Sequence, residues 1–448
     1  MNVFFVSLGC DKNLVDSEFM LGLAKKAGYQ PVSQEEEADV IVINTCCFIH
    51  DAKEESIETI LEMAAYKETG RCKLLVITGC LAQRYASEIR TELPEVDVIL
   101  GSSNIDDIVN AIEEGLAKKQ VTLMKELNYL PDLSEVDRVI TTGDYLAYLK
   151  IAEGCNKRCT YCIIPSIRGN YRSVPMEHLV AEAKRLAVKG IHELVLVAQE
   201  TTVYGQDLYG KKMLPTLLQK LCEIDGIRWI RILYCYPEEI TDELIDVMAK
   251  EEKICKYLDM PIQHSEDTML KAMGRRTNKK ELMETIEKLR ERIPGITLRT
   301  TLISGFPGET EKDHEAMMDF VDQMEFDRLG VFTYSPEEGT KAAEMENQIE
   351  ESVKIRRRDE IMELQQEISY DKNQQMIGKI IPVCVEGYLF EDDIYIGRSE
   401  KDAPKVDGSV FVRSPEEIIS GTFVNVKITD ANEYDLIGDV YYGDEFSK

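Results

Sequence analysis

Residues 153–162 read Glu-Gly-Cys-Asn-Lys-Arg-Cys-Thr-Tyr-Cys and contain a C-x3-C-x2-C run of Cys155, Cys159 and Cys162. This tight triad follows residues 146–152, whose apolar run predicts a β-strand. Structural zinc or buried free thiols would be the simplest explanation, but structural zinc takes four ligands and no fourth Cys or His lies in this segment. One loop can instead supply three thiolates to a 4Fe–4S cluster and leave its fourth iron open. Because a cluster closed by four thiolates mainly carries electrons, an open iron indicates chemistry at that iron.

A second group of cysteines is dispersed along the first third of the chain. Cys10, Cys46 and Cys80 are 36 and 34 residues apart, about one βα unit each. Apolar runs at residues 3–8, 40–44, 74–78 and 96–100 predict strands, and amphipathic patterns between them predict helices. This alternation favours a parallel sheet covered on both faces. The dispersed triad would then lie at the carboxyl ends of neighbouring strands, where such sheets bind ligands, and predicts a second metal site.

The rest of the chain predicts two further domains. After residues 118–143, a polar segment expected to be a linker, six strand-like runs alternate with helical patterns. They lie at residues 146–152, 194–198, 229–233, 257–260, 297–303 and 329–334. Six βα units are typical of a barrel, complete or open, with its active site at the carboxyl ends of the strands. A long charged helix over residues 349–375 then leads to about five short strands, typical of a small OB-like antiparallel barrel.

We therefore expect an α/β multidomain protein. Its predicted parts are a parallel, Rossmann-like domain over residues 1–117, the linker over 118–143, a partial (β/α)6 TIM-like barrel over 144–371 and a small antiparallel β-barrel over 374–442.

Composition and charge narrow the setting of this protein. The residues are 44% hydrophobic and 30% charged, as in ordinary globular proteins. No basic region precedes the first apolar run, and no stretch approaches the roughly 18 apolar residues of a spanning helix. We expect a cytoplasmic protein with no membrane partner, in which clustered cysteines bind metal rather than form disulfides. The net charge of −29 favours a basic partner over nucleic acid, although many cytosolic proteins are simply acidic.

The tight triad after the first strand of a six-unit barrel resembles the radical S-adenosylmethionine superfamily. There the open iron binds the cofactor S-adenosylmethionine, and one electron cleaves its sulfonium to a 5′-deoxyadenosyl radical. The whole chain resembles the methylthiotransferase family within it. The matching segments are Ser7-Leu8-Gly9-Cys10-Asp11-Lys12-Asn13, Asn44-Thr45-Cys46 and Gly79-Cys80-Leu81-Ala82-Gln83-Arg84.

This resemblance implies two 4Fe–4S clusters and assigns their ligands. Cys155, Cys159 and Cys162 would hold the radical SAM cluster of the barrel domain, and Cys10, Cys46 and Cys80 an auxiliary cluster whose open iron carries the sulfur to be transferred. Cys47 stands where a small residue such as glycine is usual in the family. The Asn-Thr pair before Cys46 favours Cys46 as the ligand. The C-terminal barrel would be a TRAM domain.

Two branches of the family differ in substrate. One modifies an adenosine (isopentenyladenosine) in tRNA, and the RimO-like branch modifies the β-carbon (C3) of an aspartate in ribosomal protein S-twelve. The segments at residues 199–208, 234–237 and 397–408 resemble the RimO-like branch. Residues 376–448 hold fifteen Asp and Glu against seven Lys and Arg, a net charge of −8, which suits a basic ribosomal protein better than RNA. We expect ribosomal protein S-twelve or the small ribosomal subunit as partner, and direct nucleic-acid binding to be unlikely.

Further residues match family segments that line the cofactor pocket. Gln263, in Met260-Pro261-Ile262-Gln263-His264, and Glu309, in Ser304-Gly305-Phe306-Pro307-Gly308-Glu309-Thr310, are expected to contact S-adenosylmethionine, although both segments are also ordinary turn sequences. No catalytic residue is assigned beyond the cluster ligands. Arg168 and Arg172, after the tight triad, could approach carboxylates. The electron would come from a donor such as flavodoxin or ferredoxin. A non-catalytic Fe–S protein is the rival of another class, and it would need neither an open iron nor a barrel mouth.

Overall fold

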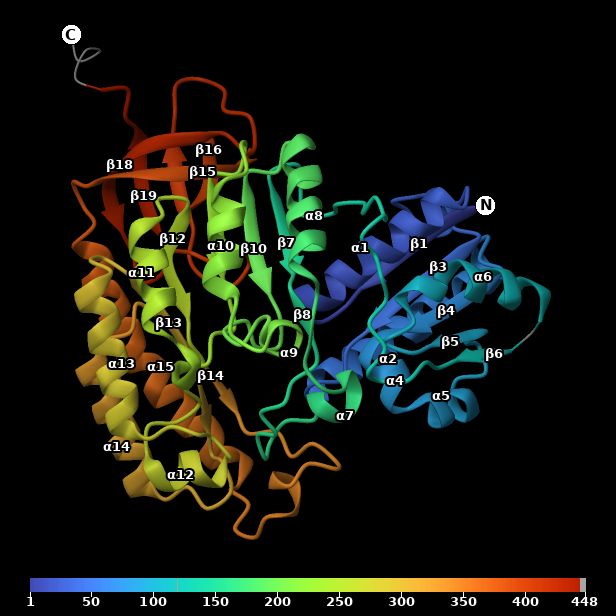
Figure 1. Ribbon diagram of the computed structural model, residues 1–448, viewed down its shortest axis with the longest axis horizontal. Coiled ribbons are helices and arrows are strands. Elements are labelled where there is room, and N and C mark those ends of the chain that lie inside the picture. Colours follow the sequence, from blue (N-terminus) through green and yellow to red (C-terminus); the bar gives the residue numbers. More distant parts are fainter. Residues whose placement is uncertain (119, 444–448) are drawn as a thin grey trace.

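The computed structural model describes residues 1–118 and 120–443. Figure 1 shows three domains: the N-terminal one beside the first strand of the central one, and the C-terminal one at one end of the central strands. Within the described residues, no helix is both long and apolar enough to cross a membrane.

The N-terminal domain is a parallel sheet of six strands in the order β2-β1-β3-β4-β5-β6. The strands are β1 (Asn2–Ser7), β2 (Gln30–Pro31), β3 (Val40–Thr45), β4 (Leu74–Thr78), β5 (Val98–Leu100) and β6 (Val121–Leu123). The helices are α1 (Asp11–Lys26), η1 (Glu35–Glu37), α2 (His50–Ala64), α3 (Tyr66–Thr69), α4 (Gly79–Arg84), α5 (Ala86–Glu92), η2 (Ile105–Asp107) and α6 (Ile108–Ala117). Strand β6 pairs with β5 inside the segment expected to be a linker.

The central domain is an open barrel of six parallel strands in the order β14-β13-β12-β11-β10-β7. These strands are β7 (Leu146–Lys150), β10 (Glu193–Val197), β11 (Trp229–Ile232), β12 (Ile254–Asp259), β13 (Thr297–Ser304) and β14 (Arg328–Thr333), and β8 (Ala152–Glu153) forms a short ribbon with β9 (Arg172–Ser173). The helices are α7 (Ile164–Arg168), α8 (Met176–Val188), α9 (Gln206–Tyr209), α10 (Leu214–Cys222), η3 (Pro237–Glu239), α11 (Asp242–Lys250), α12 (Asp267–Ala272), α13 (Lys279–Arg292), α14 (Glu311–Met324), η4 (Ala342–Glu344) and α15 (Glu351–Gln374).

The C-terminal domain is a closed barrel of five strands in the order β15-β16-β17-β19-β18. They are β15 (Ile380–Leu389), β16 (Ile394–Ser399), β17 (Val410–Arg413), β18 (Phe423–Ala431) and β19 (Leu436–Val440). All neighbours pair antiparallel except β17 and β19, which are parallel. The predicted α/β multidomain fold with a small C-terminal barrel is therefore confirmed.

The C-terminal domain packs on the amino ends of the central strands. Arg398 donates from Nη2 to Oε2 of Glu193, the first residue of β10, across 2.6 Å. Arg328, the first residue of β14, donates from Nη2 to Oδ1 of Asp402 across 2.7 Å. These pairs lie at the end of the strands opposite the tight triad, so the C-terminal domain leaves the carboxyl ends of the barrel strands uncovered.

The N-terminal and central domains share a hydrophobic core. Val15 and Phe19 of α1 belong to one buried cluster with Tyr148 and Val195 of the central sheet. On the other face of the N-terminal sheet, Ile167 of α7 packs with the core residues around β3 and β4. Because apolar contacts join the domains on both sides, the carboxyl ends of the two sheets are held close together.

Candidate active site

The tight triad lies in the loop between β8 and α7. Gly154, at φ +74°, lets this loop begin, since a Cβ there would lie 2.2 Å from the carbonyl oxygen of Asn170. Cys155 and Cys159 are buried and Cys162 is half-buried. Burial raises the pKa of Cys155 to about 11 and that of Cys162 to about 12, and the neighbouring sulfurs add to both shifts. The three thiols therefore share one site in which bound metal would have to stabilise the thiolates.

Aromatic and basic side chains form one wall of the tight triad. The hydroxyl of Tyr236 lies 3.8 Å from Sγ of Cys159. The Arg275 guanidinium lies 4.1 Å from the centre of the Tyr236 ring and donates from Nη2 to the Pro261 carbonyl across 2.9 Å. Its Nε and Nη1 atoms are buried and have no hydrogen-bond partner among the residues that the structure describes. Two orphaned donors beside the triad fit a polar ligand there. Arg275 lies outside the sequence motifs that predicted the site.

A buried lysine and an acidic group lie on another side of the tight triad. The ammonium of Lys157 is 3.6 Å from Oε1 of Glu200 and 3.5 Å from Oε1 of Glu238. Burial raises the pKa of Glu200 to about 7, although Lys157 and a hydrogen bond from Thr202 act against the shift. Glu200 therefore titrates near neutral pH next to the loop that carries the cysteines.

Gln263 and Glu309 lie in different surroundings. Gln263 is half-buried after β12, at φ +73°, and within the described chain its side chain forms no hydrogen bond. Glu309 is fully buried: Oε1 accepts from Nη1 of Arg357 across 2.8 Å and Oε2 from the Gly305 amide across 2.9 Å. Oε1 of Glu309 thus ties the turn before α14 to α15, and Oε2 closes the turn itself. Contact of Gln263 and Glu309 with S-adenosylmethionine remains a prediction.

The dispersed triad gathers at three adjacent strand ends. Cys10 follows β1, Cys46 follows β3, and Cys80 lies in the first turn of α4 after β4. Gly9 precedes Cys10 at φ +82°, and a Cβ on it would lie 2.7 Å from Sγ of Cys46. Cys80 and Cys10 are among the charged neighbours of Cys46, and its pKa is raised to about 12, mainly by burial. The three thiols that the topology predicted to be neighbours do lie together.

The side chain of Cys47 lies in a different environment from that of Cys46. Its side chain belongs to the apolar cluster with Ile41 and Ile43. Burial raises its pKa to about 12, and its main charged neighbours are Cys80, Arg84 and Cys46. Cys80 is thus a close neighbour of both thiols, whereas Cys10 is a leading charged neighbour of Cys46 and not of Cys47.

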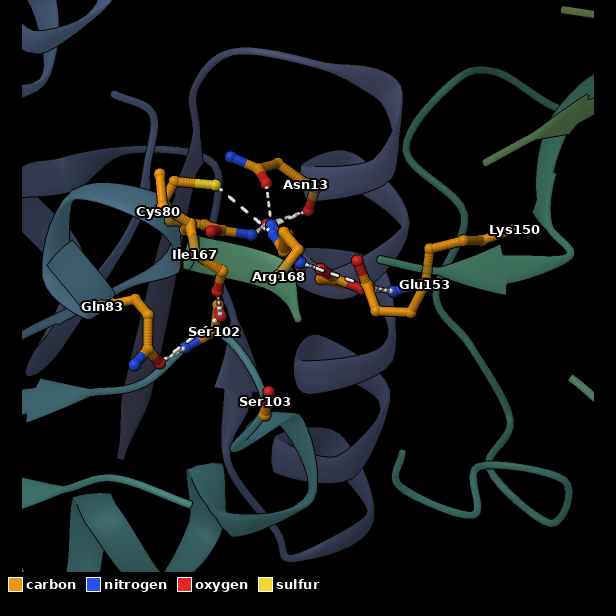
Figure 2. Close-up of polar contacts among 12 residues, drawn as sticks. Asn13, Cys80, Gln83, Ser102, Ser103, Lys150, Glu153, Ile167 and Arg168 are labelled. Carbon is orange, nitrogen blue, oxygen red and sulfur yellow. Dashed lines mark hydrogen bonds and ion pairs between the residues drawn. The ribbon is translucent and has the colours of Figure 1, made fainter. Parts of the chain in front are cut away.

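A buried ionic network links Cys80 of the dispersed triad, across the domain boundary, to Glu153, two residues before Cys155 (Figure 2). Nε of Arg168 donates to Sγ of Cys80 across 3.4 Å, and Nη1 donates to Asp16 across 2.9 Å and to Glu153 across 3.3 Å. Lys150 donates to both Asp16 and Glu153. Burial alone would raise the pKa of Glu153, but Lys150 and Arg168 hold it well below its usual range. The expected approach of Arg168 to carboxylates is confirmed, whereas Arg172 donates to the carbonyls of Asn170 and Arg168.

The loop after β11 contacts Cys159 of the tight triad and Lys12, which stands two residues after Cys10 of the dispersed triad. Tyr236 contacts Cys159, and two residues earlier the ring of Tyr234 lies 3.5 Å below the ammonium of Lys12 in α1. Burial would lower the pKa of Lys12, but the charges of Tyr234, Cys10 and Asp11 outweigh it and raise the pKa. A segment of three residues thus connects the surroundings of Cys10 with those of Cys159.

The spacing of the sulfur atoms bears on which metal the triads fit. Among the described residues, the one group of three metal-ligating side chains with all ligand atoms within 4.8 Å is exposed and contains no cysteine: His50, Asp51 and Glu54. A tetrahedral zinc ion with Zn–S bonds of about 2.3 Å would need sulfurs about 3.8 Å apart. In the part of the chain that the structure describes, neither triad has all three sulfur atoms within 4.8 Å of one another. A cluster in which each thiolate binds a separate iron takes sulfur atoms that are further apart than those around one zinc ion.

Comparisons with known proteins give a consistent result. Residues 2–101 match the Uncharacterized protein family UPF0004, residues 149–321 the Radical SAM superfamily and residues 377–440 the TRAM domain. A protein of Lachnoclostridium phytofermentans named "Ribosomal protein uS12 methylthiotransferase RimO" is 60% identical over 98% of this chain and 99% of its own length. Proteins of the same name from Clostridioides difficile and Pelotomaculum thermopropionicum are 49% and 52% identical over 99% and 98% of this chain, and over 99% of their own length.

Solved structures share the fold. The radical S-adenosylmethionine methyltransferase TsrM from Kitasatospora setae superimposes with a TM-score of 0.52 at 15% identity, covering 74% of this chain and 72% of TsrM. The cobalamin-dependent S-adenosylmethionine radical enzyme OxsB gives a TM-score of 0.50 at 12% identity, over 76% of this chain and 54% of OxsB.

Proposed function

The chain belongs to the RimO family of radical S-adenosylmethionine methylthiotransferases, and we propose that it transfers a methylthio group to the β-carbon (C3) of an aspartate in ribosomal protein uS12. The observation that carries this proposal is the convergence of both triads on one loop. Tyr234 and Tyr236, two residues apart, face the surroundings of Cys10 and of Cys159. A C–H bond held between two such sites could lose hydrogen on one side and receive sulfur on the other.

Cys155, Cys159 and Cys162 would hold the cluster that binds S-adenosylmethionine, and Cys10, Cys46 and Cys80 the auxiliary cluster. When bound, these groups would supply one-electron cleavage of the sulfonium and a methylthio donor, chemistry that side chains lack. The orphaned Nε and Nη1 donors of Arg275 and the free amide of Gln263 suit the polar groups of the cofactor.

The side chains of this protein prepare the site in three ways. Tyr236 contacts Cys159, which is buried from water, and the guanidinium of Arg275 stacks on the Tyr236 ring. Lys157 balances the acidic group of Glu200, Glu238 and Glu239. Arg168 brings a buried positive charge to Cys80, where a thiolate would otherwise be poorly solvated. Each of these contacts either stabilises negative charge or excludes solvent, and a radical reaction needs both effects at this site.

The charge of the C-terminal domain supports a protein substrate. Three of its charged residues form polar contacts with the central domain: Arg398, Asp402 and Asp407. The acids that remain exposed include Glu391, Asp392, Asp393, Glu416 and Glu417. An acidic surface attracts a Lys- and Arg-rich ribosomal protein and repels a phosphate backbone. The alternative is methylthiolation of isopentenyladenosine in tRNA by the same chemistry.

We place the reaction in the cytoplasm, where ribosomes are available as substrate, with flavodoxin or ferredoxin as electron donor. The test is anaerobic turnover with reconstituted clusters, S-adenosylmethionine and reductant, in which uS12 and tRNA are offered in parallel. Mass spectrometry should find one added methylthio group on uS12 and none on tRNA. Modified tRNA with untouched uS12 would favour the alternative. Cofactor cleavage without either product would refute both substrates.

A further inference from the structure

Lys12 is a buried cation without an acidic partner in contact. Its side chain lies over the ring of Tyr234, with Nζ 3.5 Å from the ring centre, and the residue is 7% exposed. Within residues 1–118 and 120–443, no carboxylate lies within ion-pair distance of this ammonium. Other buried cations near the triads differ from it: Lys150 pairs with Asp16 and Glu153, and Arg168 with the same two acids. A buried charge in hydrogen-bond contact with no anion is costly unless a ligand supplies one.

The Tyr234 ring beneath Lys12 is held in one position by contacts of the Tyr234 backbone. Tyr234 adopts φ +61°, a left-handed conformation that is strained for a tyrosine. Its amide donates to Oδ2 of Asp259 across 2.9 Å, and its carbonyl accepts from the Thr201 amide across 3.0 Å. Asp259 in turn accepts from Nη1 of Arg299 across 2.8 Å. Strain that the surroundings hold in place is typical of functional sites, because it fixes a side chain in one orientation.

The position of Lys12 relates it to both triads. It stands two residues after Cys10, in the first turn of α1, and Cys10 is one of the groups whose charge acts on it. The Tyr234 ring that carries the ammonium is two residues from Tyr236, whose hydroxyl lies 3.8 Å from Sγ of Cys159. An anion bound to Lys12 would therefore lie between the source of sulfur and the site of hydrogen removal.

We propose that the Lys12 ammonium binds the side-chain carboxylate of the target aspartate and thereby selects aspartate as the substrate; this inference rests on the proposed function. The carboxylate carbon is bonded directly to C3, so a charge-assisted hydrogen bond to Lys12 fixes the reacting carbon one bond away. The Lys12 ammonium can form a hydrogen bond between opposite charges with a carboxylate, whereas an uncharged adenine offers it only a neutral ring-nitrogen acceptor, a weaker contact. Lys12 would thus act through substrate binding, without a change in its own charge.

The test is a double-mutant cycle, in which each enzyme variant is combined with each substrate variant. Two labelled peptides, one with the target aspartate of uS12 and one with asparagine in its place, are titrated anaerobically with reconstituted holoenzyme without reductant, and binding is read by fluorescence anisotropy. The enzymes are the wild type, Lys12→Met, Lys12→Arg and Lys26→Met, an exposed lysine at the other end of α1 as matched control. Iron content and circular dichroism report whether each variant folds and holds its clusters.

We expect the wild type to bind the aspartate peptide roughly tenfold more tightly than the asparagine peptide, the usual effect of one charged hydrogen bond. Lys12→Met should lose this preference while its affinity for the asparagine peptide changes less than twofold. Lys12→Arg should keep a preference, and Lys26→Met should match the wild type. An unchanged aspartate preference in Lys12→Met, or an equal loss for both peptides, would overturn the inference and leave Lys12 as a charge that only offsets the cluster.

The same preparation separates this inference from the proposed function. Reductant and S-adenosylmethionine are then added. If the wild type modifies uS12 and Lys12→Met still prefers the aspartate peptide to the asparagine peptide as strongly as the wild type does, the role of Lys12 is rejected and the proposed function stands. A wild type that cleaves the cofactor without modifying uS12 would reject the proposed function, and the inference with it.

Discussion

Arg168 of the central domain donates from Nε to Sγ of Cys80 in the N-terminal domain across 3.4 Å, 88 positions away in sequence. The same guanidinium binds Asp16 and Asn13 of the N-terminal domain and Glu153, two residues before Cys155. One buried side chain therefore contacts a cysteine of the dispersed triad and the segment that begins the tight triad. A donor that hydrogen-bonds to a residue holding a metal orients that residue and influences the properties of the metal.

Arg168→Gln should weaken and retune the auxiliary cluster. In a background with Cys155, Cys159 and Cys162 changed to Ala, we expect iron to be lost to a chelator roughly tenfold faster. The reduction potential should fall, because a nearby positive charge stabilises the more negative reduced state. Lys at this position should restore part of the potential, since it keeps the charge but not the Nε contact. An EPR-monitored redox titration measures this, with exposed Arg71→Gln as control. Identical potentials for Arg168→Gln and its parent would contradict the assignment.

Gly9→Ala should destroy the auxiliary site while the radical SAM site persists. The new Cβ would lie 2.6 Å from Cβ and 2.7 Å from Sγ of Cys46, at φ +82°. Gly28→Ala is the matched control, because Gly28 has φ +94° with no atom within 4 Å of the added Cβ. Iron and sulfide analysis should show one cluster in Gly9→Ala and two in Gly28→Ala. Equal losses in the two variants would assign the effect to backbone strain rather than to the contact with Cys46.

Cys46→Ala and Cys47→Ala should differ although they are adjacent. Cys46 has both Cys80 and Cys10 as close charged neighbours, whereas Cys47 packs with Ile41 and Ile43. We expect Cys46→Ala to lose the auxiliary cluster and Cys47→Ala to keep it with little loss of stability. Iron content per chain in the background without the tight triad checks this. Retention of iron by Cys46→Ala and its loss from Cys47→Ala would reverse the ligand assignment.

The pKa of Glu193 predicts how a fall in pH affects the stability of the contact between the central and C-terminal domains. Burial opposes its charge, but Arg398 and Arg231 hold its pKa below the ordinary value of 4.5. A carboxyl with a lowered pKa contributes stability that is present above its unfolded pKa and is lost as the pH falls through the folded pKa. Glu193→Gln should therefore cost about 3 kcal/mol at pH 7 by leaving buried arginine charge uncompensated.

Thermal unfolding of the iron-free protein between pH 7 and pH 3 tests this prediction. The gap between wild type and Glu193→Gln should narrow below pH 4.5, as Glu193 becomes protonated in the wild type. Glu391→Gln, at an exposed position of the same domain, should track the wild type throughout. A gap of constant size across this range would show that Glu193 acts through its shape rather than its charge.

The fold and the cysteines could be predicted because each depends on local signals. Runs such as Val40–Thr45 are continuous and apolar, and each cysteine follows such a run, so the parallel topology alone gathers Cys10, Cys46 and Cys80. Strands β2 and β6 escaped prediction because segments of two and three residues, Gln30–Pro31 and Val121–Leu123, carry no periodicity. These two segments form strands because they pair with the edges of the sheet, and their own sequences do not predict this pairing.

The contacts around the cysteines could not be predicted in the same way. The interactions of Arg168 with Cys80 and of Lys12 with Tyr234 join different domains. They depend on how two sheets dock, which neither spacing nor hydrophobic pattern encodes. Arg275 gave no signal because its unpartnered nitrogens become visible only when its neighbours are in place.

The most direct test of the central claim follows the hydrogen of the substrate. Ribosomal protein uS12 in which deuterium replaces both hydrogens at C3 of the target aspartate would be incubated anaerobically with the reconstituted protein, S-adenosylmethionine and reductant. We predict that one deuterium appears in 5′-deoxyadenosine and that the same aspartate gains one methylthio group in place of that deuterium and keeps the other. Methylthiolation with both deuterium atoms retained, or deuterium-free 5′-deoxyadenosine alongside modified uS12, would contradict removal of hydrogen from C3 between the two sites.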